Sequence, residues 1–65
     1  MGHMLRGMDN QCAVKRLSEQ ERCDLNQQVG TLLQYQEGSW LVDLPATEKR
    51  PAEKVWIELK NLKPP

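Results

Sequence analysis

The sequence predicts an all-β fold, a small barrel of about five short antiparallel strands with room for a single helical turn. Residues 25–44 contain two apolar runs separated by a short polar stretch with a glycine, which is the pattern of a β-hairpin. Residues 54–60 alternate between apolar and charged side chains, which indicates a strand with one buried face. Because a lone hairpin is marginally stable in water, the rest of the chain is expected to close around it.

The hairpin is expected to pair Val29–Tyr35 with Trp40–Leu44 through the connection Gln36–Ser39. Gly38 can adopt the positive φ that such a connection needs. In the second strand, alternation predicts a core face of Trp40, Val42 and Leu44, with Trp40 as the main filler of the core.

Neighbouring leucines in the first hairpin strand do not fit one buried face. Leu32 and Leu33 point in opposite directions in a regular strand, yet both are apolar. A strong bend at or near Gly30 would let both side chains find cover.

The segment before the hairpin is expected to supply the first strand. Residues 11–17 are predicted to be extended, with a helix as the rival interpretation. Residues 18–23 begin with the form of a capping box and predict either one helical turn or a polar surface loop. Asn26 tolerates a left-handed conformation and predicts a tight turn before Val29, with Leu25 packed beneath it.

The segment after the hairpin is expected to be a mobile polar loop and then a closing strand. Two prolines interrupt residues 45–53, and proline cannot donate to a sheet ladder. The strand over residues 54–60 has an apolar face of Val55, Ile57 and Leu59. Residues 61–63 are predicted to form a single tight turn that tucks Leu62 into the barrel.

Length and composition restrict the class of protein. The first ten of the 65 residues are interpreted as an expression scar and a tail, which leaves one domain over residues 11–65. A chain of this size has a small core and no room for a deep catalytic cleft. Its nine basic and nine acidic residues balance, so a dedicated nucleic-acid binder is not indicated. No signal peptide, membrane span or membrane partner is expected.

Cys12 and Cys23 are the only cysteines. Because secreted domains of this size usually carry more of them, two reduced thiols in an intracellular protein are preferred to a disulfide. With no histidine outside the scar, the two thiols cannot complete a four-ligand zinc site. No metal and no cofactor are predicted.

Three stretches resemble a known family, the SH3-like barrels with a KOW-type hairpin. They are DLNQQVGTL at residues 24–32, WLVDL at residues 40–44 and IELKNLKP at residues 57–64. In that group a Leu-Asn-Gly turn precedes a Gly-x-Val strand, and a Leu-x-x-x-Asn-Leu segment closes the domain. The chain departs from the pattern at Gln27, where the family usually has glycine, and Asn26 is expected to supply the positive φ. The Ala-Leu-Tyr-Asp-Tyr run of peptide-binding SH3 domains is missing, so recognition of proline-rich ligands is not carried over.

The residues offer little for catalysis. Neither cysteine has a histidine to serve as its base, and no phosphate-binding glycine loop is present. Asp43 and Glu58 lie on outer strand faces and could approach each other across the sheet, as paired carboxylates for acid–base chemistry do. A solvated face is the preferred interpretation of both, and no enzyme activity is predicted.

Trp56 is the most informative residue. Its neighbours in the alternation are charged, so its indole is expected on the outer face, where Leu41 could join it in an exposed apolar patch. The alternative is that the tail, Met8 or the 45–53 loop covers the indole. Tyr35 could extend the same surface or cap the rim of the core. The predicted partner-binding residues are Trp56, Leu41, Tyr35, Glu58 and Asp43.

Two functions follow. The first is a non-catalytic protein-interaction module within a larger cytoplasmic or nuclear protein, which binds a peptide segment of a partner or a second copy of itself. The alternative is a KOW- or Tudor-like domain that binds RNA or a modified protein tail, although Tyr35 and Trp56 are too few for an aromatic cage. RNA binding would use an exposed ring and the basic residues Lys49, Arg50, Lys54, Lys60 and Lys63.

Overall fold

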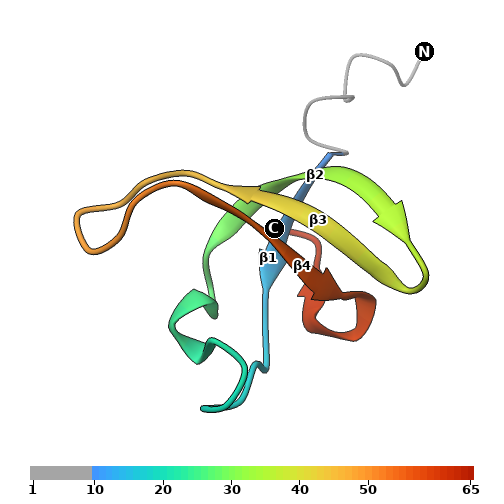
Figure 1. Ribbon diagram of the computed structural model, residues 1–65, viewed down its shortest axis with the longest axis horizontal. Coiled ribbons are helices and arrows are strands. Elements are labelled where there is room, and N and C mark those ends of the chain that lie inside the picture. The colour runs from blue at the N-terminus through green and yellow to red at the C-terminus, as the bar shows by residue number, and fades with distance from the viewer. Residues whose placement is uncertain (1–9) are drawn as a thin grey trace.

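The computed structural model describes residues 10–65 as five antiparallel strands that curl into a half-barrel (Figure 1). The all-β prediction is therefore confirmed. The predicted scar and tail lie outside the described residues, except for Asn10. The strands follow the order β4-β3-β2-β1-β5 across the sheet. In chain order the elements are β1 (Gln11–Val14), the 3-10 turn η2 (Cys23–Leu25), β2 (Val29–Gln36), β3 (Ser39–Leu44), β4 (Glu53–Glu58), the 3-10 turn η3 (Leu59–Asn61) and β5 (Leu62–Lys63).

The predicted hairpin forms between β2 and β3, but its turn is shorter than expected. Gln36 pairs with Ser39, so only Glu37 and Gly38 connect the strands. Their φ angles are 49° and 89°, and positive values at both positions define the two-residue turn that matches the twist of a hairpin. The conformation expected of Gly38 is confirmed.

The irregularity in β2 lies three residues beyond the glycine. Leu32 pairs with Val42 and Gln34 pairs with Leu41, so Leu33 is the extra residue of a β-bulge. Leu33 stays 45% exposed, so the expectation that a bend would cover both leucines is wrong. Gly30 serves a different purpose. It is buried, and a Cβ atom there would lie 2.7 Å from Val42 Cγ1 and 2.8 Å from the carbonyl oxygen of Asp43.

Aliphatic side chains form the centre of the core. The largest fully buried side chains are Leu25, Leu44, Val14 and Val42. The predicted burial of Leu25 is confirmed. Trp40 is only half-buried and packs against this cluster, so it is a rim residue and not the main filler.

Asn26 does not adopt the conformation that the sequence suggested. Its φ is −56°, and the left-handed residue is Gln27, with φ of 75°. Asn26 acts through its side chain, because its Oδ1 accepts a hydrogen bond from Leu17 N at 2.8 Å and its Nδ2 donates to Leu17 O at 3.0 Å. The Asn26 side chain thus links the end of the connection between β1 and β2 to its beginning at Leu17.

That connection contains turns and no α-helix. β1 ends at Val14, three residues before the predicted end of the strand. Glu21 Oε1 accepts a hydrogen bond from Ser18 N at 3.1 Å, which is half of the capping box seen in the sequence. The only helical turn in this connection is η2, which begins at Cys23.

The last predicted strand breaks in two. β4 ends at Glu58 because its final partner on β3 is Ser39, directly after the hairpin turn. Beyond it, Leu59 N donates to Gly38 O at 2.9 Å, and the chain turns through η3. Leu59 is 55% exposed, which contradicts its predicted place in the core. Leu62 is half-buried against the core as predicted, although the turn begins two residues earlier than expected.

The loop between β3 and β4 has a defined turn. Thr47 N donates to Arg50 O at 2.8 Å, and the two residues form an isolated antiparallel bridge. Within residues 10–65, no helix has the length and apolar character needed to span a bilayer.

Candidate interaction surface

The register of β3 and β4 places Leu41 directly opposite Trp56. Directly opposite residues of an antiparallel pair share one face, so the two side chains are neighbours on the outer face, away from the core residues Val42 and Ile57. Trp56 is 47% exposed and Leu41 is half-buried. We call the face formed by this pair and by its neighbours along the two strands the outer β3–β4 face. The neighbours are Ser39, Asp43, Lys54 and Glu58.

The two predicted carboxylates lie at opposite ends of this face. Asp43 is opposite Lys54, and Glu58 is opposite Ser39. Four residue steps along the ladder separate them, which corresponds to about 13 Å. The expectation that they could approach each other is wrong. Glu58 instead has Lys60 Nζ at 3.4 Å from its Oε1, an exposed ion pair.

Tyr35 lies on the other face of the sheet. It is the direct partner of Trp40, and the two ring centroids are 5.3 Å apart with the planes tilted by 58°. Tyr35 is 52% exposed, so it caps the rim of the core and does not extend the surface around Trp56. Tyr35 and Trp56, the two rings considered for an aromatic cage, thus lie on opposite faces of the sheet.

A small trough lies between β4 and the connection from β1 to β2, with a volume of about 130 Å³. One wall carries residues Val55–Glu58 of β4, so Trp56 belongs to both the outer face and the trough. The opposite wall carries Leu17, Glu21 and Leu25. This trough was not predicted, although leucines at both ends of a polar connection, Leu17 and Leu25, are a signal that those ends return to the core.

Asn61 fixes the base of this trough. Its side chain is buried, and its Nδ2 donates to Lys15 O at 3.0 Å and to Arg16 O at 3.2 Å. Lys15 N donates in turn to Asn61 O at 2.8 Å. The connection is therefore tied to η3 by the Asn61 side chain and by one backbone hydrogen bond, and it is tied to itself by Asn26.

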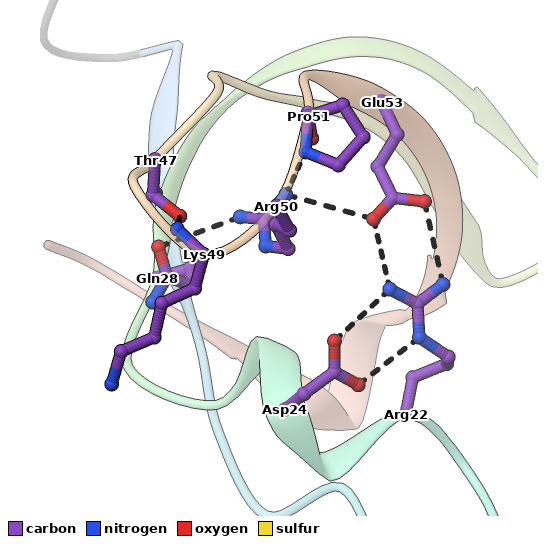
Figure 2. A network of polar contacts seen from close by, with 8 residues as sticks. All are labelled: Arg22, Asp24, Gln28, Thr47, Lys49, Arg50, Pro51 and Glu53. Carbon is purple, nitrogen blue, oxygen red and sulfur yellow. Dashed lines mark hydrogen bonds and ion pairs between the residues drawn. The ribbon is translucent and has the colours of Figure 1, made fainter.

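A polar network joins the connection to the start of β4 (Figure 2). The Arg22 guanidinium contacts Glu53 at 2.8 Å and Asp24 at 3.0 Å. These contacts lower the pKa of both carboxyls and raise the pKa of Arg22. The network was not predicted, because nothing local relates Arg22 to Glu53.

The basic residues do not gather into one free stripe. The Arg50 side chain is 11% exposed and lies 3.6 Å from Glu53. Arg50 also donates to Pro51 O and to Gln28 Oε1, as Figure 2 shows. Lys60 is paired with Glu58. Two of the five basic residues considered for phosphate contact are thus already engaged with carboxylates.

Both cysteines are free thiols in unlike surroundings. Cys12 is buried, and this burial raises the pKa of its thiol despite a hydrogen bond with Gly30. Cys23 is exposed. Among residues 10–65, histidine, cysteine, aspartate and glutamate form no group of three that could hold a metal ion.

A second, larger hollow of about 380 Å³ lies near the carboxyl end of the chain. Its wall is mostly apolar and includes Leu32, Leu59, Leu62 and Pro64. It lies beside β1 and β5, and Trp56 and Leu41 do not line it.

These features define residues 10–65 as a small antiparallel half-barrel that carries an exposed tryptophan on its outer face. No protein-family model, curated protein or solved structure matches this chain.

Proposed function

We propose that this chain is a non-catalytic protein-interaction module of SH3-like architecture, which binds through the outer β3–β4 face. The observation that carries the proposal is Trp56, which is 47% exposed and lies directly opposite Leu41. Indole and aliphatic surface left together in water is typical of partner sites. The partner is a peptide segment of another protein or a second copy of the chain.

The SH3-like assignment is supported by the connectivity of the sheet. Its strand order, the long connection between β1 and β2 and the 3-10 turn before β5 are compatible with such a barrel. The sequence resemblance to the KOW-type hairpin points the same way. An intracellular place is supported by the two cysteines, which are not joined to each other.

The choice of a binding role over catalysis is supported by the spread of reactive groups. Asp43 and Glu58 are apart on the outer face, and the thiol of Cys12 is buried. The RNA alternative draws less support, because the mostly buried Arg50 side chain is engaged with Glu53.

The test compares two exposed rings that lie on opposite faces of one sheet. Trp56→Ala is expected to keep the fold and to abolish binding of a partner that the wild-type chain captures. Tyr35→Ala is the matched control and is expected to bind as the wild type does. Amide shift mapping with the captured partner should move signals of β3 and β4.

Two results would remove the proposal. One is a Trp56→Ala variant that is folded by circular dichroism and still binds its partner with unchanged affinity. The other is tight binding of labelled single-stranded RNA that weakens steeply with salt, because such binding is electrostatic and points to phosphate contacts.

A further inference from the structure

β4, the strand that carries Trp56, lies at the edge of the sheet, and its second edge has no partner strand among residues 10–65. It pairs only with β3, and no backbone hydrogen bond among residues 10–65 uses the opposite side of Glu53–Glu58. Alternate N–H and C=O groups of a strand point to each side, so half of these groups face outward. An unprotected edge of this kind is a template for another strand.

We propose that a second copy of this chain occupies that edge, with the two β4 strands antiparallel and Trp56 at the two-fold axis. This inference rests on the proposed function and names the partner of the same surface. Directly opposite residues in an antiparallel pair share a face. The outer residues of the two copies therefore lie on one common face only when the two-fold axis passes through a residue and not between two residues. Any of the six residues of β4 could lie on the axis, and centres on Val55 and Trp56 pair the longest stretch of the strand.

The side chains select among these registers. A centre on Trp56 places Lys54 opposite Glu58 of the second copy, and this pair occurs twice by symmetry. Val55 lies opposite Ile57 twice, and the two indoles meet at the axis. Every pair within Lys54–Glu58 is then between opposite charges or between apolar groups, the pairs that stabilise a sheet.

The neighbouring registers are poorer. A centre on Val55 places the charged Lys54 opposite Trp56 and Glu53 opposite Ile57. A centre on Ile57 places Glu58 opposite Trp56, and centres on Glu53, Lys54 or Glu58 place a charged side chain opposite its own copy. The sequence of β4 is therefore complementary to itself in one register only.

The surroundings of the edge fit this partner. Val55 and Ile57 of the added strand would face the trough whose far wall is Leu17 and Leu25. On the outer face, Glu58 is already near Lys60, but both side chains are mostly exposed. Such a pair contributes little and does not hold Glu58 away from Lys54 of the second copy.

The experiment measures self-association by sedimentation, from roughly micromolar to millimolar protein, in reducing buffer that prevents disulfides through Cys23. The wild-type chain should form dimers. Lys54→Glu and Glu58→Lys each create two like-charge pairs in the dimer and should each weaken it by about tenfold or more. An equimolar mixture of these two variants restores opposite charges at both pairs, so it should associate like the wild type.

A control mixture distinguishes an effect of the pairing register on dimerisation from an effect of net charge. Lys49→Glu and Glu48→Lys change the net charge by the same amounts but lie in the exposed turn between β3 and β4. Each should dimerise like the wild type, and their mixture should show no gain over either variant alone.

Three outcomes would overturn the inference. They are a wild-type chain that stays monomeric at millimolar concentration, charge variants that dimerise normally, and a Lys54→Glu and Glu58→Lys mixture no tighter than the control mixture. If the chain stays monomeric while Trp56→Ala still loses a captured protein partner, the inference fails and the proposed function stands. If dimers form but Trp56→Ala leaves all binding intact, both fail.

Discussion

The β2–β3 hairpin and the connection between β1 and β2 are held in different ways. The hairpin is fixed by its own backbone, through the two-residue turn at Glu37 and Gly38 and an almost continuous ladder. The connection has no ladder along most of its length. Two side-chain amides secure it, Asn26 within the connection and Asn61 from the other end of the chain.

This difference separates local from long-range determinants of the fold. A turn residue such as Gly38 acts on its immediate neighbours, so its role follows from the residues beside it. Asn61 acts on carbonyl groups of Lys15 and Arg16, which are more than forty residues away in the chain. Three substitutions test whether the two regions are held as described.

The largest effect on stability is expected from Gly30→Val, which disrupts the packing between the hairpin strands. Its Cβ would lie 2.7 Å from Val42 Cγ1 and 2.8 Å from Asp43 O, and the second of these is backbone that cannot move aside cheaply. We expect a loss of about 3 kcal/mol or more in the free energy of unfolding, measured by urea denaturation.

Gly38→Ala is the matched control for Gly30→Val. A Cβ at Gly38 would meet no atom within 4 Å, but its φ of 89° is unfavourable for alanine. The expected cost is about 1–2 kcal/mol. Equal losses for the two glycines would show that close packing at Gly30 is not what requires a glycine.

A smaller loss is expected from Asn61→Ala, which acts on the connection. It removes the side-chain donor to the carbonyl groups of Lys15 and Arg16. Leaving partly buried acceptors unpaired should cost about 2 kcal/mol by chemical denaturation. Gln34→Ala removes an exposed amide from β2 and should cost less than about 0.5 kcal/mol. If Asn61→Ala is as mild as this control, the amide does not secure the connection.

The smallest effect is expected from Gln27→Gly, and its sign is opposite. Gln27 has φ of 75°, which costs a side chain energy that glycine avoids. The backbone hydrogen bond from Gln27 N to Val14 O is available to glycine as well. We expect a gain of up to about 1 kcal/mol in thermal or urea unfolding. Gln20→Gly, at an exposed position without positive φ, should be neutral or destabilising, and a gain there would contradict this explanation.

Much of the fold could be predicted because its signals are local. Alternation indicated the strand around Trp56, and a glycine between two apolar runs indicated the hairpin. The end of β4 could not be predicted in this way. The alternation continues to Leu59, but the strand stops where β3 no longer offers a partner, which is a property of the paired strand.

The candidate surface was predicted in part, and Tyr35 shows why the rest failed. Regular alternation from Thr31 places Tyr35 on the outer face, with Asp43 and Leu41. The bulge at Leu33 adds one residue and moves Tyr35 to the opposite face, where it meets Trp40. The residues next to Leu33 do not predict the bulge, because the bulge depends on how β2 pairs with β3.

The contrast between the two cysteines gives the molecule a built-in chemical reporter. The thiolate form of cysteine attacks alkylating reagents, so the buried Cys12, whose pKa is raised, should react more slowly in the native state than the exposed Cys23. The second modification should accelerate when β1 separates from its neighbours, because Cys12 is 3% exposed in the native state. The rate at which a doubly alkylated product accumulates therefore reports on the opening of this strand. Mass spectrometry can follow this rate without an added label or an engineered site.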